Sequence, residues 1–152
     1  LHNQEFDEPV DAMIYMIAAA LGFAAIENIL VLFQSIPSGA NITLQTWALR
    51  FVGATLLHAV SSAMVGYFLA LSWFYNRHSR KLIFSGIAIA SIFHFIFNVT
   101  LLKGERSEGF LYSTILLIIV AVTISFLFAK IKRRAGRVAA ETNSLSTEAV
   151  LP

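Results

Sequence analysis

The chain has 152 residues, of which 57% are hydrophobic and only 13% are charged, and its formal net charge at pH 7 is +2. Soluble domains carry about 25% charged residues, so this composition is typical of a membrane protein. The sequence contains no cysteine, which excludes disulfide bonds, thiolate nucleophiles and zinc–thiolate sites.

Four apolar runs follow one another along the chain, and each is close to the roughly 20 residues that a helix needs to cross a bilayer core. They cover residues 10–33, 51–75, 82–102 and 110–129. Segment 35–46 contains proline and glycine and is predicted to be a loop, whereas 76–81 and 103–109 are predicted to be short polar turns. The expected fold class is therefore all-α, a polytopic transmembrane helix bundle with four spans in this chain.

Basic residues gather in two clusters, one between Arg77 and Lys81 and one between Lys130 and Arg137. Each cluster adjoins an apolar run, which favours a lipid surface over nucleic acid as its partner. Because cytoplasmic loops are enriched in Lys and Arg, we predict that both clusters lie on the cytoplasmic side of the membrane.

The predicted organisation has three parts. Residues 1–9 form a cytoplasmic N-terminal segment, residues 10–137 form the transmembrane domain, and residues 138–152 form a disordered cytoplasmic tail. The tail is predicted to be disordered because it is rich in Ala, Ser, Thr and Glu and has few large apolar residues.

Glu27, His58 and His94 each interrupt a different predicted span. Ionisable side chains within a span are costly and usually face a partner, a substrate or a water-filled cavity. At about 1.5 Å per residue, all three lie roughly 10–12 Å below the outer ends of their spans, so antiparallel helices would place them in one layer. Asn98 lies one turn beyond His94 on the same helix face. We predict that these four residues form one site.

Each of these residues also has a simpler interpretation as a hydrogen-bonding group between helices. We favour a joint site because the three depths match and because a membrane protein has no structural need to retain an acid such as Glu27 within a span. The fourth predicted span carries no ionisable residue and is interpreted as structural.

Several stretches around these positions form an ordered set of motifs. They are residues 7–15 and 22–28, His58-Ala59-x-x-Ser62-Ala63-x-x-Gly66, and His94-x-x-x-Asn98. Together they resemble the motifs of the PrsW family of intramembrane proteases, over residues 5–102. That family is related to the type II CAAX prenyl endopeptidases, whose sites also combine Glu, His and Asn from several helices.

The resemblance implies an intramembrane endopeptidase that cleaves a membrane-anchored protein, such as an anti-sigma factor, in the bacterial cytoplasmic membrane. The expected catalytic residues are Glu27, His58, His94 and Asn98. Glu27, His58 and His94 are also the expected ligands of a Zn²⁺ ion, since two His and one Glu with an open position form a known catalytic zinc set. Without a metal, Glu27 would activate a water while His and Asn98 hold the oxyanion. The sequence leaves both mechanisms open.

The family also has a pair of adjacent glutamates, followed by a lysine, on a helix before the first span seen here. No adjacent pair of glutamates occurs in this sequence. We therefore expect the chain either to begin downstream of that motif or to have lost it, and residues 1–152 alone to insert in a membrane without cleaving substrate.

Two other functions remain as alternatives. One is a proton- or ion-coupled transporter that uses Glu27 and the two histidines as a relay, and the other is a non-catalytic membrane scaffold. Four spans without a pair of broken helices make the transporter less favoured.

Overall fold

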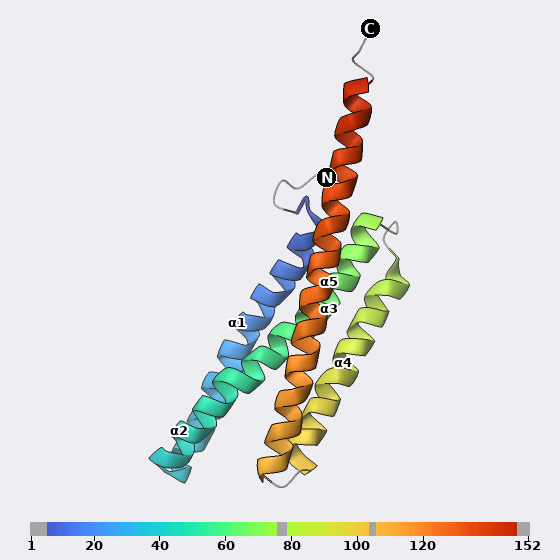
Figure 1. Ribbon diagram of the computed structural model, residues 1–152. Helices are drawn as coiled ribbons and strands as arrows, with labels where there is room; N and C mark the ends of the chain where they lie inside the picture. The colour runs from blue at the N-terminus through green and yellow to red at the C-terminus, as the bar shows by residue number, and fades with distance from the viewer. Residues whose placement is uncertain (1–5, 76–78, 104–105, 149–152) are drawn as a thin grey trace.

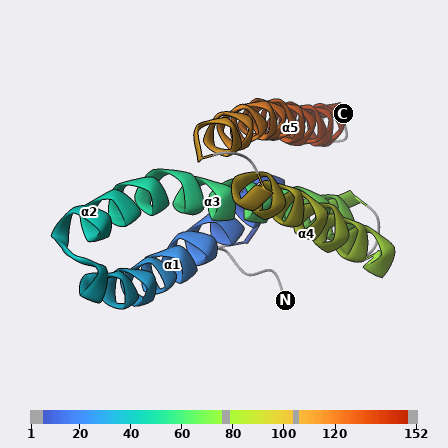
Figure 2. The same ribbon diagram turned by 90° about the horizontal axis from the view of Figure 1, so that it is seen from below.

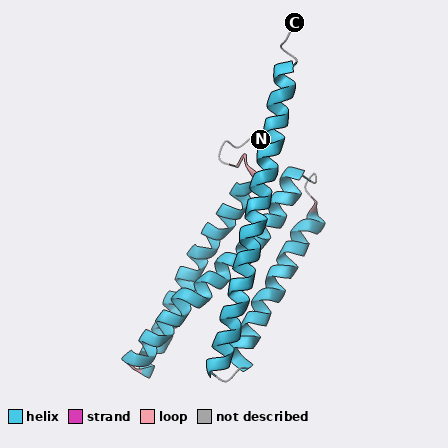
Figure 3. Cartoon of the chain, viewed as in Figure 1, coloured by secondary structure: helices cyan, strands magenta, loops and turns pink. Residues whose placement is uncertain are grey.

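The computed structural model describes residues 6–75, 79–103 and 106–148, which form helices joined by short turns (Figure 1, Figure 3). No strand occurs among these residues. The elements in chain order are α1 (Pro9–Ser35), η1 (Ile36–Ser38), α2 (Ala40–Leu49), η2 (Arg50–Ala54), α3 (Thr55–Ala70), η3 (Leu71–Tyr75), α4 (Arg80–Lys103) and α5 (Arg106–Glu148). Here η1 is a 3-10 turn, and η2 and η3 are π-helical turns.

Four helical stretches in the described part of the chain are long and apolar enough to cross a membrane. They are Pro9–Ser38, Ala40–Tyr75, Arg80–Thr100 and Leu111–Glu141. The prediction of an all-α protein with four spans is therefore confirmed, and the chain is an integral membrane protein.

Helix α3 lies at the centre of the bundle, where it packs against α1, α4 and α5. It approaches α1 closely at Gly66, where an added Cβ would lie 2.7 Å from the Cα of Met13 and 2.8 Å from the carbonyl oxygen of Ala12. Small residues let membrane helices approach closely enough to gain packing contacts. Gly66 therefore brings α1 and α3 together with almost no space between their backbones.

Helix α5 lies on one side of the other helices, as the view along the bundle shows (Figure 2). It contributes Leu117, Ile124 and Ile131 to the buried core. These residues are spaced by seven, which places them on one face of the helix about two turns apart. Many large apolar side chains on the other helix faces are exposed, as expected for surfaces that meet lipid.

The loop predicted for residues 35–46 is shorter in the structure. The turn is confined to η1 and Gly39, whose φ of 98° lies in the left-handed region that favours glycine. Helix α2 begins at Ala40, because the proline and glycine signals mark the turn itself and the residues beyond it have side chains that fit a helix. The second membrane-spanning stretch is thus longer than predicted, and it includes Arg50.

The C-terminal region also differs from the prediction. Helix α5 continues to Glu148, where the sequence predicted disorder from residue 138. The segment beyond the apolar run contains Ala, Arg and Glu, which have high helix propensity, so it extends an existing helix without a new nucleation step. Residues 149–152 of the predicted tail lie outside the described residues.

The predicted turns at 76–81 and 103–109 are only partly described. Helix α4 begins at Arg80 and α5 begins at Arg106, so both turns are shorter than predicted. Residues 76–78 and 104–105 of these predicted turns lie outside the described residues.

Candidate active site

Glu27 on α1 and His58 on α3 are in direct contact. The Nε2 atom of His58 lies 2.7 Å from the Oε2 atom of Glu27, and both side chains are partly buried. The close packing of α1 against α3 allows these side chains to meet across the helix interface. The two residues therefore lie at one level of the helix bundle, as the predicted joint site requires.

His94 on α4 lies beside His58, with 5.4 Å between the ring centroids. The Nδ2 atom of Asn98 lies 3.3 Å from the Nδ1 atom of His94. Because the Asn98 amide nitrogen can only donate, Nδ1 of His94 is the acceptor, and the proton of the neutral ring is on Nε2. The four predicted site residues thus come together in two pairs, Glu27 with His58 and His94 with Asn98.

A cavity of about 190 Å³ joins the two pairs. Glu27, His58, His94 and Asn98 all line it, and Leu57, Phe97 and Leu117 supply apolar walls. A pocket with a few converging polar groups among apolar side chains is the usual form of a ligand or active site.

Helix α5 adds polar groups to this cavity through Ser113 and Thr114. Ser113 is only 2% exposed, and its hydroxyl group has no hydrogen-bond partner within the described structure. The fourth span therefore contributes polar groups to the wall of the cavity, although it carries no ionisable residue among its apolar turns. Sequence analysis did not single out these two residues, because serine and threonine are ordinary packing residues in membrane helices.

Sequence analysis missed Arg50, which lines the same cavity. Its Nη2 atom lies 3.2 Å from the Oε1 atom of Glu27, so the two side chains form an ion pair. A signal for this residue was available, because Ile42, Leu44 and Trp47 continue the apolar pattern upstream and make Arg50 an interruption within it.

His58, His94 and Asn98 also line a second hollow, of about 420 Å³, between α3 and α4. Ser61, Ser62 and Ser91 contribute hydroxyl groups to its wall. The histidines therefore lie between two hollows, which gives the candidate site two sides from which a ligand can approach.

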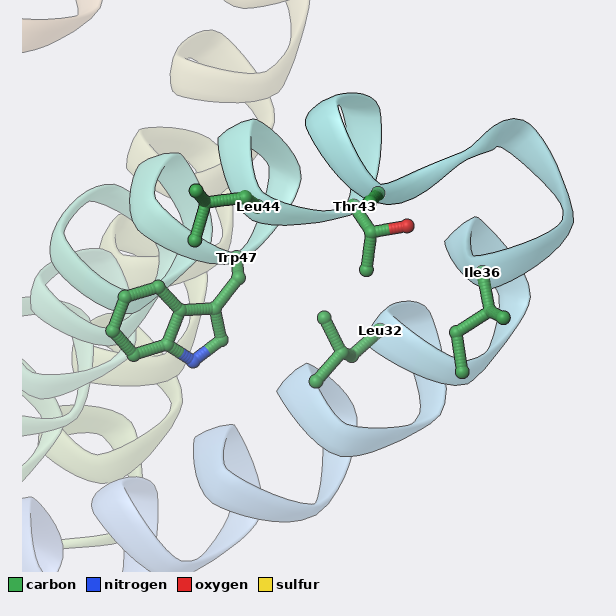
Figure 4. A pocket seen from close by; sticks show the side chains of 6 residues that line it. Leu32, Ile36, Thr43, Leu44 and Trp47 are labelled. Atoms are coloured by element: carbon green, nitrogen blue, oxygen red, sulfur yellow. The ribbon is translucent and has the colours of Figure 1, made fainter.

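A larger hollow, of about 590 Å³, lies between the C-terminal part of α1 and α2 (Figure 4). Its lining contains no titratable side chain and consists of Leu32, Ile36, Ala40, Thr43, Leu44 and Trp47. It carries none of the predicted site residues, so its size does not make it a candidate for chemistry.

The predicted zinc ligands do not form a metal site as they are arranged. No group of three or more His, Cys, Asp or Glu side chains in the described ranges is placed to hold a metal ion. The Glu27 and His58 atoms that would bind zinc are bonded to each other instead, and Glu27 also pairs with Arg50. A catalytic zinc ion needs about three protein ligands around it. Zinc binding by Glu27, His58 and His94 therefore stays a prediction.

Comparison with known proteins places these observations in a family. The family model described as "PrsW family intramembrane metalloprotease" matches residues 1–126. Three curated relatives carry the name Protease PrsW. The relative from Clostridioides difficile is 27% identical over 126 residues, which are 82% of this chain and 50% of that protein.

The other two relatives match a shorter stretch. The Geobacillus kaustophilus protein is 28% identical over 104 residues, which are 68% of this chain and 43% of that protein. The Oceanobacillus iheyensis protein is 31% identical over 105 residues, which are 69% of this chain and 45% of that protein. The chain thus spans about half the length of the curated relatives it matches. No solved structure matches the chain significantly.

The matched region contains α1, α3 and α4, and so all four predicted site residues lie within it. It also includes most of the apolar part of α5. The resemblance noted from the sequence motifs is therefore confirmed over most of the chain, and this chain belongs to the PrsW family of intramembrane metalloproteases.

Proposed function

We propose that this chain carries the catalytic site of an intramembrane endopeptidase, which hydrolyses a peptide bond of a membrane-anchored protein. The observation that supports this most directly is the 2.7 Å contact between Glu27 and His58 at a cavity that His94 and Asn98 also line. A carboxylate and an imidazole within a membrane are costly, so their pairing at a cavity favours a chemical role.

Peptide hydrolysis requires an activated water and stabilisation of the oxyanion that forms when the water attacks the carbonyl carbon. The Glu27–His58 pair takes the proton of the attacking water, since the contact between them orients both groups. The same proton then passes to the nitrogen of the leaving amine as the carbon–nitrogen bond breaks. This role needs only one water molecule in the cavity.

The second pair supplies hydrogen-bond donors for the oxyanion. Nε2–H of His94 and the Nδ2 amide of Asn98 are donors, and both residues line the cavity. In this role they act on a charge that exists only in the transition state, which is how such donors accelerate acyl transfer.

A metal ion belongs to the family's description, and when bound it would polarise the carbonyl and lower the pKa of a bound water. Coordination by Glu27 and His58 would require the 2.7 Å contact between them to open. Purified full-length protein should be analysed for zinc by mass spectrometry. Active protein without zinc supports the Glu27–His58 pair as the base. If the protein instead holds one zinc per chain, and His94→Ala loses it, the side chains rearrange around a metal.

The substrate class and the location are part of the proposal. The resemblance to the family supports a membrane-anchored substrate such as an anti-sigma factor, and a site in the bacterial cytoplasmic membrane. The basic residues near the start of α4 and along the later turns of α5 support an orientation with these ends in the cytoplasm.

The proposal is tested by cleavage of a single-span reporter that carries a different epitope tag at each end, reconstituted in liposomes with the full-length protein. Glu27→Gln should lower the cleavage rate by about 10³-fold or more, because it removes half of the general base. Glu108→Gln is the matched control, since it makes the same chemical change at an exposed residue near the start of α5.

Normal cleavage by Glu27→Gln would contradict the proposal. If neither variant nor the wild type cleaves, measurement of proton flux in the same liposomes separates the two alternatives. Flux that depends on Glu27 would identify a transporter, and its absence would leave a scaffold.

A further inference from the structure

We propose that Arg50 is a positioning residue, which holds the carboxylate of Glu27 in the orientation that its contact with His58 requires. The inference rests on the proposed function, because it assigns Arg50 a task within that site. It adds a residue from η2, an element outside the motifs that carry the family resemblance.

The two oxygen atoms of Glu27 have different partners. Oε1 lies 3.2 Å from the Nη2 atom of Arg50, and Oε2 lies 2.7 Å from the Nε2 atom of His58. A carboxylate that is held at one oxygen can rotate about its terminal bond, whereas one that is held at both oxygens cannot. The Arg50 contact is an ion pair without a hydrogen bond at Nη2, and its charge therefore holds the plane in which the carboxylate of Glu27 faces His58.

Arg50 is itself held in place by a closed set of hydrogen bonds. Its Nε atom donates to Oδ1 of Asn28 at 3.2 Å, and Nδ2 of Asn28 donates to Oγ1 of Thr55 at 2.9 Å. The Thr55 hydroxyl donates in turn to the carbonyl oxygen of Arg50 at 3.5 Å. This ring links α1, η2 and α3 beside the candidate base, and Asn28 is the residue next to Glu27.

The π-helical turn explains why Arg50 and His58 can face the same carboxylate. In a regular α-helix, residues eight apart are about 80° out of line. The backbone N–H of Thr55 donates to the carbonyl of Arg50, five residues earlier, so η2 takes up one residue more than an α-helical turn. Arg50 and His58 are then spaced like residues seven apart, which are about two full turns apart and nearly in line.

A π turn within a membrane helix weakens its regular hydrogen bonding and is frequent at functional sites. Here it has a specific consequence, because without it Arg50 would lie about 80° around the helix axis from His58. The turn and the ion pair are independent observations, one of the backbone and one of the side chains, and both favour the same role.

The alternative is that Arg50 extends its charged end to the membrane surface, as many arginines in spans do. The contacts are against this, because the guanidinium group lies against Glu27 and Asn28 and lines the cavity. A planar guanidinium with several fixed donors suits two simultaneous partners, whereas the ammonium of lysine acts as a point charge. The role therefore predicts different results for arginine and lysine at this position.

The first test measures kcat and KM for cleavage of the doubly tagged single-span reporter by full-length protein in liposomes. Arg50→Ala should lower kcat by about 10²-fold with little change in KM, since a misplaced catalytic group affects the transition state more than binding. Arg50→Lys should retain the charge but recover only part of the rate. Arg80→Ala is the matched control, since it removes one positive charge at an exposed residue of α4.

Added guanidinium ion should raise the rate of Arg50→Ala by about tenfold or more, because it can occupy the vacated position next to Glu27, and it should leave Glu27→Gln inactive. A purely structural role for Arg50 predicts no such rescue. If Arg50→Ala fails to insert, Arg50→Lys and Arg50→Gln provide the comparison, and wild-type kcat in either would overturn the proposal.

A second measurement does not depend on activity. The infrared difference spectrum between wild type and Glu27→Gln isolates the carboxylate bands of Glu27, and Arg50→Lys should shift these bands while Arg80→Ala leaves them in place. Unshifted bands in Arg50→Lys would overturn the proposal. Normal cleavage by Glu27→Gln would instead contradict the proposed function. If Glu27→Gln is inactive while Arg50→Ala is fully active, only the proposed role of Arg50 is contradicted.

Discussion

The two halves of the candidate site differ in how firmly their side chains are held. On the α1–α3 side, Glu27 has a partner at each carboxylate oxygen, and Arg50 is tied to both helices. On the side of α4 and α5, His94 has one contact of 3.3 Å with Asn98, and the Ser113 hydroxyl has no hydrogen bond in the described structure. The first half is thus held by more side-chain contacts than the second, although the Nη2 atom of Arg50 makes an ion pair and no hydrogen bond in the described structure.

This difference follows from helix packing. Gly66 allows α1 and α3 to approach until an added Cβ would overlap the Met13 backbone, whereas His94 meets His58 only through rings 5.4 Å apart. A base must be in place before the reaction, while donors for a substrate need to remain unpaired until the substrate arrives. The comparison therefore predicts that damage to the α1–α3 half affects the reaction most.

The largest effect is expected from the Glu27–His58 pair. His58→Ala should lower the rate of reporter cleavage by about 10³-fold or more, and the double variant with Glu27→Gln should be little worse than either single variant. Residues that act as one unit lose nearly all their effect when either is removed. Cleavage rates of the three variants, measured at equal amounts in the membrane, check this. Losses that multiply would show that the two residues act separately.

The next effect concerns the packing that brings the pair together. Gly66→Leu should lower the melting temperature in detergent and reduce cleavage by about 10²-fold, because the added side chain forces α1 away from α3 and moves the base. Gly22→Leu is the matched control, since an added Cβ at Gly22 meets no atom within 4 Å. Equal behaviour of the two variants would show that the α1–α3 contact does not position the site.

A smaller effect is expected from the second pair. Asn98→Ala should reduce kcat by about 10²-fold at most, because it removes one donor to the oxyanion and one contact to His94 while the base stays intact. Steady-state kinetics with the single-span reporter measure this loss. A loss as large as that of His58→Ala would make Asn98 part of the base and would remove the distinction between the two halves.

The smallest effect is expected from the free hydroxyl on α5. Ser113→Ala should change cleavage by less than about tenfold and act mainly on KM, and it should not lower stability, since it removes a buried hydroxyl that has no hydrogen bond in the described structure. Ser125→Ala is the matched control, because the Ser125 hydroxyl donates to the carbonyl of Ala121 within its own helix. A marked loss of stability in Ser113→Ala would show that this hydroxyl has a structural partner.

Much of the architecture follows from local sequence. Apolar runs of membrane-spanning length predict the four spans regardless of packing, because backbone groups in lipid must be satisfied within a helix. Counting from the ends of these spans also predicts that Glu27, His58 and His94 share one layer, since the rise per residue is constant. The structure confirms the four spans, while the shared layer and the catalytic roles of these residues remain predictions.

Other features depended on contacts between helices. The extent of the 35–46 loop was wrong, because Pro37 and Gly39 signal a turn but not its length. The role of Arg50 was missed, since its importance comes from a π turn and from Glu27, 23 positions earlier in the sequence. The hydroxyl of Ser113 looked ordinary for the same reason.

The sequence by itself determined how many helices are long and apolar enough to cross the membrane, and that an ionisable residue interrupts each of the first three. These properties depend on hydropathy and helix geometry, which act over a few neighbouring residues. Only the tertiary structure decided that Glu27 contacts both His58 and Arg50. These contacts depend on how closely α1, α3 and α4 approach one another. Packing at positions such as Gly66 sets that distance, and the sequence of a single helix does not determine it.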